Sequence, residues 1–187
     1  PLPFVFGWGG FNDTEARSIH LAFAIFLGIA AFPAARTKVQ LGLGIIVPVV
    51  LAYLFMVAAK DGTPTWWIPL VAIVIVACVV LGSPKDRIPL WEWALALVGA
   101  AAALYLFVYY REISGRVGAP NMQDTVVFVI GIMILLEATR RALGPALMIV
   151  ASVFLVYNVL GPMMPDIIAH KGNSLSEIVN HQWITTE

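Results

Sequence analysis

Six apolar segments separated by short polar loops fill this 187-residue chain, and they constrain its fold more than any other feature. Hydrophobic residues make up 60% of the sequence and charged residues only 12%, against roughly 25% charged residues in a typical soluble domain. A soluble fold of this length could not hide so much apolar surface, whereas a bilayer accepts helical spans of about 20 apolar residues. The sequence therefore predicts an all-α, polytopic integral membrane protein. Its six expected spans cover residues 18–33, 41–59, 66–82, 91–110, 124–143 and 145–160.

A short amphipathic helix is expected after the last span, over residues 174–184. Ser174 and Glu177 have the spacing of a capping box, and the apolar residues behind them share one helical face. This helix is too short to cross a bilayer, so we expect it to lie in the membrane interface or to dock on a partner. The whole chain is expected to form one transmembrane domain.

One group of charged residues lies near the end of the fifth segment. Glu137 precedes Arg140 and Arg141 by three and four residues, which places all three on one side of a helix. Ionisable residues within a membrane are costly and are usually paired or functional. One interpretation is a charged anchor that fixes a partner helix or a lipid headgroup. The simpler alternative is a salt bridge at the end of a span, whose arginines extend toward the membrane surface.

Other polar positions offer little material for chemistry. Glu92 lies between Trp91 and Trp93, where we expect an interfacial carboxylate at a helix start, favoured by the helix dipole, within an aromatic belt. The three histidines are scattered and share no metal-ligand spacing. The small-residue stretch 99–103 is expected to let another helix approach closely. The sequence therefore predicts neither catalysis nor a cofactor in this chain.

Several blocks of sequence are distinctive when they are taken together. They read IHLAFA at 19–24, FPA at 32–34, RIPLWEWALAL at 87–97, LEATRR at 136–141, GPMMP at 161–165, AHKG at 169–172 and HQWITTE at 181–187. In combination these blocks resemble the N-terminal membrane region of fused permeases of the tripartite ATP-independent periplasmic (TRAP) transporters, of the TAXI type. The blocks at 136–141 and 181–187 are specific together and weak singly.

This resemblance implies a role as the small, Q-type membrane component of an ion-gradient-driven, binding-protein-dependent transporter for organic acids. Such a component packs against a large M-type subunit or domain, which carries the substrate and the sodium sites and moves as an elevator. The small component widens the static scaffold and helps to receive a periplasmic TAXI-type substrate-binding protein. The resemblance also implies the bacterial inner membrane and contact with its lipids, and no nucleic acid is expected as a partner.

The chain departs from the family pattern in three respects. The large transport domain is absent, so the chain alone should not transport, and the start at Pro1 leads us to expect a natural N-terminus upstream. The helix pair within residues 41–82 looks like an addition to a simpler four-helix plan. Our hypothesis is that this pair extends the scaffold at its lipid-facing edge.

Seven residues are candidates for contacts with another subunit or with lipid. The sequence also leaves a second class of function open beside the transporter component. The alternative is a self-contained small membrane channel or membrane enzyme, which would need a polar cluster converging from several helices, and for this the sequence offers only Ser152, Asn158 and Glu137. The interface candidates are Glu137, Arg140, Arg141, Trp91, Trp93, His170 and Trp183.

Overall fold

The computed structural model describes residues 13–34, 37–60, 62–82, 87–116 and 118–184, and every regular element in this part of the chain is helical. The predicted all-α class is therefore confirmed. Six longer helices follow the six apolar segments: α2 (Asp13–Ala30), α3 (Lys38–Ala58), α4 (Ile68–Leu81), α5 (Leu90–Val108), α7 (Met122–Ala142) and α8 (Pro145–Leu160). The described residues also form four short elements: α6 (Tyr110–Ser114), the 3₁₀ turn η1 (Gly161–Met163), α9 (Leu175–Val179) and the π-helical turn η2 (Asn180–Ile184).

Four helices are long and apolar enough to cross a membrane: α3, α5, α7, and α8 together with η1. This establishes a membrane protein of the all-α class, but the predicted six spans are not confirmed. The helix α4 is apolar but has only 14 residues. The helix α2 has 18 residues, and its first turns carry Asp13, Glu15 and Arg17, which lower its hydropathy. These two differences separate the structure from the six-span prediction.

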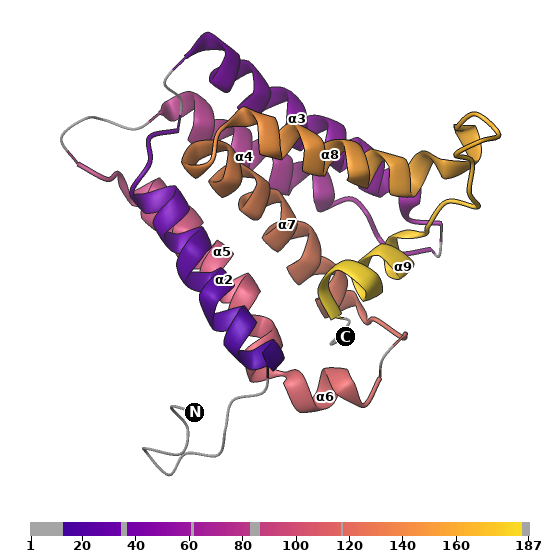
Figure 1. Ribbon diagram of the computed structural model, residues 1–187. Coiled ribbons are helices and arrows are strands. Elements are labelled where there is room, and N and C mark those ends of the chain that lie inside the picture. The colour runs from indigo at the N-terminus through magenta and orange to yellow at the C-terminus, as the bar shows by residue number, and fades with distance from the viewer. Residues whose placement is uncertain (1–12, 35–36, 61, 83–86, 117, 185–187) are drawn as a thin grey trace.

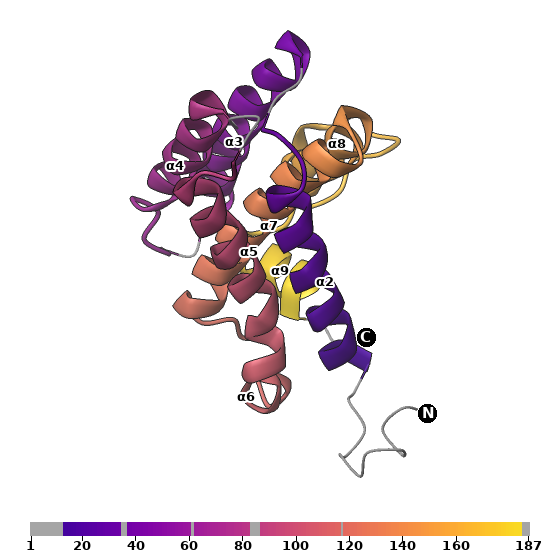
Figure 2. The same cartoon turned by 90° about the vertical axis from the view of Figure 1, so that its left-hand side faces the viewer.

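The helices meet at one end of the molecule and spread apart at the other (Figure 1). The helices α2 and α5 run antiparallel side by side, and α3 and α4 form a second antiparallel pair beside α8 (Figures 1 and 2). Between these two groups runs α7, which contacts all of them. The end of α7, the end of α2 and the starts of α3 and α5 therefore come together at the closed end of the fold.

Close packing along α7 depends on two glycines. A Cβ atom added to Gly99 of α5 would lie 2.6 Å from Cγ2 of Ile25 and 2.7 Å from Cγ2 of Ile134, so only glycine lets α2, α5 and α7 approach at this point. The prediction that residues 99–103 admit a neighbouring helix is confirmed. Gly131 of α7 plays the same part for Trp183, whose Cη2 would lie 2.6 Å from an added Cβ.

The C-terminal amphipathic segment packs against α7 of the same chain. The predicted capping box is confirmed: the Ser174 backbone N–H donates to Glu177 Oε2 at 2.8 Å, and the Glu177 N–H donates to Ser174 Oγ at 3.4 Å. The apolar face of α9 and η2 lies against α7, where Trp183 makes an edge-on contact with Phe128. The buried residues of this face are Leu175, Ile178, Val179, Trp183 and Ile184.

Candidate functional site

Four charged side chains are buried together at the closed end of the fold, and we call them the charge cluster: Glu92, Glu137, Arg140 and Arg141. None exposes more than 6% of its surface. The last turns of α7 supply three of them, at the predicted i+3 and i+4 spacing, and the first turn of α5 supplies Glu92. Two carboxylates face two guanidinium groups, so the cluster is neutral as a whole.

Arg140 joins α7 to the segments on either side of the α2–α3 connection. Its Nε donates to Glu137 Oε2 at 2.8 Å and its Nη2 to Glu137 Oε1 at 2.6 Å. The same guanidinium donates to two backbone carbonyls, at 2.9 Å to Gln40 and also to Ala34. Gly44 of α3 leaves room for it, because an added Cβ there would lie 3.2 Å from Arg140 Cζ. The guanidinium therefore holds the start of α3 on the end of α7.

Arg141 makes the equivalent connection to α2 and α5. Its Nε donates to Glu137 Oε1 at 2.7 Å and its Nη1 donates to Glu92 Oε1 at 2.9 Å. Longer contacts of 3.4 and 3.5 Å reach the carbonyls of Ile29 and Phe32, at the end of α2. Helix ends leave unpaired carbonyls, and a cation placed beside them interacts favourably with the helix dipole. Arg141 thus closes the C-terminal end of α2.

The geometry of the charge cluster favours the anchor interpretation over a salt bridge that extends toward the surface. A buried pair contributes little net stability when it is complete, but losing one partner leaves an uncompensated buried charge at a cost of about 3–5 kcal/mol. The elements that this anchor fixes belong to the same chain. We therefore interpret the cluster as a lock that holds the ends of α2 and α7 against the starts of α3 and α5.

A second buried polar network holds the other end of α5 against α7. The Asp124 carboxylate accepts hydrogen bonds from Tyr105 Oη at 2.8 Å, from Arg116 Nη2 at 3.0 Å and from the Asn121 N–H at 2.8 Å. In turn, the Asn121 side-chain oxygen accepts a hydrogen bond from the Asp124 N–H at 2.9 Å, which caps the start of α7. Hydrogen bonding to Asp124 raises the pKa of Arg116 above its ordinary value. Sequence reasoning missed this network, because its members lie on three separate elements.

His170 organises the turn that follows α8. The Gly172 N–H donates to His170 Nδ1 at 3.0 Å, so Nε2 carries the proton that contacts the Tyr157 carbonyl at 3.0 Å. The ring leaves no room for a side chain at Gly161, where an added Cβ would lie 2.3 Å from Cε1. Beside it, Asn173 pairs with Asn158 at 3.0 Å. These contacts tie the loop before α9 to the end of α8.

No family model, no curated protein and no solved structure matches this chain.

The predicted interface residues occupy three different environments. The three charged candidates lie inside the charge cluster, and Trp183 is buried against α7. Trp91 and Trp93 are exposed at the start of α5, with 36% and 41% of their surfaces accessible. The ring of Trp93 also packs against the ring of Phe26, with 5.7 Å between the ring centroids. His170 is half-buried in the turn after α8. An interface role for the exposed tryptophans stays a prediction.

Sequence reasoning also missed the partner of Glu92. It expected an interfacial carboxylate favoured by the helix dipole and gave it no partner, whereas in the structure the side chain is only 2% exposed and pairs with Arg141, 49 residues further along the chain. The position of Glu92 in the first turn of α5 is as expected. The sequence offered one signal for the Glu92–Arg141 pair: a carboxylate inside one predicted span and two arginines at the end of another.

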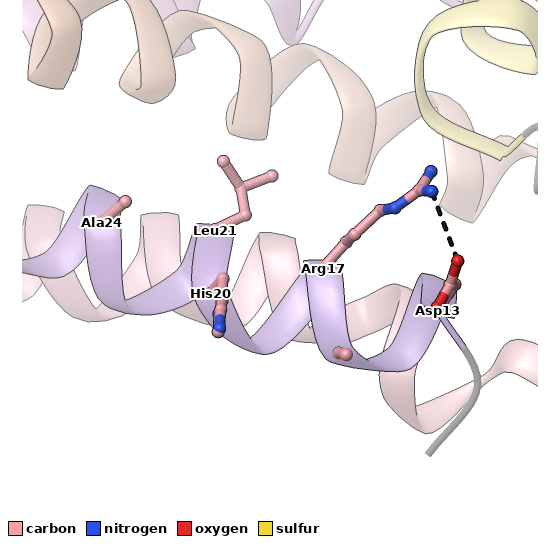
Figure 3. A pocket seen from close by; sticks show the side chains of 6 residues that line it. Asp13, Arg17, His20, Leu21 and Ala24 are labelled. Carbon is pink, nitrogen blue, oxygen red and sulfur yellow. Dashed lines mark ion pairs between the residues drawn. The ribbon is translucent and has the colours of Figure 1, made fainter. Parts of the chain in front are cut away.

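Two of the hollows outside the charge cluster differ in their lining. A groove of about 710 Å³ between α4, α5 and α7 is lined by bulky apolar side chains, among them Trp66, Trp67 and Trp91. A pocket of about 500 Å³ lies on α2 and includes Asp13, Arg17 and His20 (Figure 3). Within the part of the chain that the structure describes, no three His, Cys, Asp or Glu side chains gather as a metal site.

Proposed function

We propose that this chain is the small membrane component of a TRAP-type secondary transporter for organic acids and serves as a scaffold for a large transport subunit. Two things support this: the resemblance of its sequence blocks to the TAXI-type permeases, and the charge cluster, which carries the proposal from the structural side. A static scaffold must keep its shape while a neighbouring domain moves. A neutral lock that ties four helices together at one end gives such rigidity.

The outer surface supports the same proposal. Large apolar side chains are exposed along α3, α4 and α8, for example Tyr53, Ile73 and Phe154, at 62–67% of their surfaces. Contiguous apolar surface of this kind suits lipid or the apolar surface of another membrane protein. In this proposal sodium and substrate bind the large subunit, and a periplasmic binding protein delivers the substrate.

The test is affinity purification of the tagged chain from its native membranes in mild detergent, followed by intact mass measurement of everything recovered. We expect a much larger polytopic protein, fused to the chain or bound to it. Recovery of a lone 20.3 kDa chain would contradict the proposal. Flux or turnover in liposomes that hold this chain alone would instead favour the channel or enzyme alternative.

The helix pair α3–α4 gives a second test of the scaffold. The hypothesis of a lipid-facing extension predicts that deleting residues 41–82 spares uptake and lowers stability or expression. Complete loss of uptake with normal expression would refute it. Gly44 of α3 lies against the Arg140 guanidinium, so the deletion uncovers a buried charge, and this explains why stability should fall.

A further inference from the structure

A proline inside α3 leaves one backbone carbonyl without its ordinary helical donor. Each C=O in an α-helix accepts from the N–H four residues further on, and Pro48 has no N–H, so the carbonyl of Gly44 loses this partner. Both residues are buried. Buried backbone carbonyls are paired in native proteins with other backbone groups, with side chains or with ordered water. The Gly44 carbonyl therefore calls for a donor other than the helical one.

The side chains around Gly44 do not supply that donor. The guanidinium of Arg140 lies beside Gly44, but its hydrogen bonds go to the Glu137 carboxylate and to two other backbone carbonyls. In the part of the chain that the structure describes, no side chain donates to the Gly44 carbonyl. Ordered water is one of the groups that satisfy the carbonyls freed by proline in membrane helices.

A small cavity adjoins this position, between α3, α7 and α8. Gly44, Pro48 and Glu137 line it, together with apolar side chains that include Met133 and Met148. Its volume is about 10 Å³, which is just enough for one water molecule. Purely apolar cavities stay dry, whereas a buried water is held by two to four polar partners. The cavity therefore holds a water only if Gly44 and Glu137 both offer it a hydrogen bond.

The Glu137 carboxylate has an acceptor position left for such a bond. A carboxylate offers about four lone-pair positions, two on each oxygen. Oε1 accepts from Arg140 Nη2 at 2.6 Å and from Arg141 Nε at 2.7 Å. Among the described residues, Oε2 accepts from Arg140 Nε alone, at 2.8 Å. One position on Oε2 and the Gly44 carbonyl thus make two acceptors, and a water molecule carries two O–H donors.

We propose that this cavity binds one water molecule, which donates one hydrogen bond to the Gly44 carbonyl and the other to Glu137 Oε2. The water joins α3 to the charge cluster at a second point, one helical turn beyond the Gln40 carbonyl. A metal cation suits the site less well, because the Arg140 guanidinium beside Gly44 repels it and because Ca²⁺ takes six or more oxygen ligands. The water site does not depend on the proposed scaffold function.

The first test is water-edited solid-state NMR of the whole chain in lipid bilayers. Glycine labelled with ¹³C at the carbonyl and isoleucine labelled with ¹⁵N mark three peptide bonds, which follow Gly28, Gly44 and Gly131. Gly131 is the matched control, because it is buried within α7 and Leu135 provides an N–H at the ordinary helical spacing. We expect polarisation from water to reach the Gly44 carbonyl and not the Gly131 carbonyl.

Pro48→Ala tests the cause of the site. The alanine supplies the missing N–H, so the Gly44 carbonyl regains its helical partner and the water loses one of its two acceptors. We expect the water-derived signal at Gly44 to be lost in this variant. Val50→Ala should keep the signal, because Val50 is exposed on the same helix and lies outside the cavity.

Radiolytic footprinting gives a measurement that needs no variant. Brief X-ray exposure converts a bound water into a hydroxyl radical, which oxidises the nearest side chains and forms methionine sulfoxide. Met133 and Met148 line the cavity and are each 2% exposed, so radicals formed in bulk water do not reach them. We expect sulfoxide at both positions in the folded parent, identified by mass spectrometry of its peptides.

Three NMR results would overturn the water site: no water-derived signal at Gly44 in the parent, equal signals at Gly44 and Gly131, or an unchanged signal in folded Pro48→Ala. If Pro48→Ala does not fold, the footprint of the parent decides the matter. Absence of sulfoxide at both Met133 and Met148 would then refute the proposal. None of these outcomes bears on whether the chain is a transporter scaffold.

Discussion

Glu137→Leu is the substitution that tests the charge cluster most directly. The carboxylate accepts three hydrogen bonds, two from Arg140 at 2.6 and 2.8 Å and one from Arg141 at 2.7 Å. Its removal leaves Arg141 paired with Glu92, whereas Arg140, 1% exposed, keeps only backbone carbonyls as partners. A buried charge without its counter-ion costs about 3–5 kcal/mol. At about 2–4 °C per kcal/mol, the unfolding midpoint should fall by about 6–20 °C.

The single buried cysteine supplies the assay. Cys78 should react with a thiol-sensitive dye only when the bundle opens, so the dye signal in detergent reports unfolding during heating. The double variant Glu137→Leu/Arg140→Met restores a neutral cluster, and we expect it to be more stable than the single variant by about 2 kcal/mol. Lys171→Met is the control, because it breaks an exposed pair with Glu177 and should cost less than about 1 kcal/mol. A double variant less stable than the single one would refute the reasoning.

Two further predictions concern the C-terminal segment. Gly131→Ala should lower the free energy of unfolding by about 1–3 kcal/mol, because the added Cβ would meet the Trp183 ring. Limited proteolysis should then cleave the variant within residues 175–184. Protection equal to that of the parent would contradict this packing. The capping box predicts a pH dependence, because the Ser174 N–H, and after it Lys171, lower the pKa of Glu177 below 4.5. The ionised carboxylate therefore stabilises the fold fully above pH 4.5, and this contribution disappears as the pH falls through the lower folded-state value. Tryptophan fluorescence melts should show this acid loss in the parent and not in Glu177→Gln, and identical slopes would count against it.

Local patterns predicted the helices well, because apolar run length and capping residues act over a few neighbouring positions. The helix starting at Pro145, the capping box at Ser174 and the close approach at Gly99 all follow from adjacent residues. The number of spans could not be predicted in the same way, because a run of apolar residues does not show where the helix begins or ends. At α2 the helix extends back over charged residues, and at α4 it stops after 14 residues.

The candidate site was predictable only in the part that lies on one helix. The spacing of Glu137, Arg140 and Arg141 reveals their mutual contacts, but it carries no information on which other elements surround them. Glu92 and the carbonyls of α2 and α3 reach the cluster through tertiary packing, which decides whether an arginine points to the surface or inward. Burial of the cluster is therefore a property of the assembled bundle.

The charge cluster also sets an order of events during synthesis. Arg141 contacts the carbonyl of Ile29, made 112 residues earlier. At about 5–20 residues per second, the end of α2 emerges some 6–20 s before its partner. During that interval α2, α3 and α5 are made without the cations that join them. We therefore expect a nascent chain that stops before Arg140 to hold the earlier helices without the charge cluster that joins them.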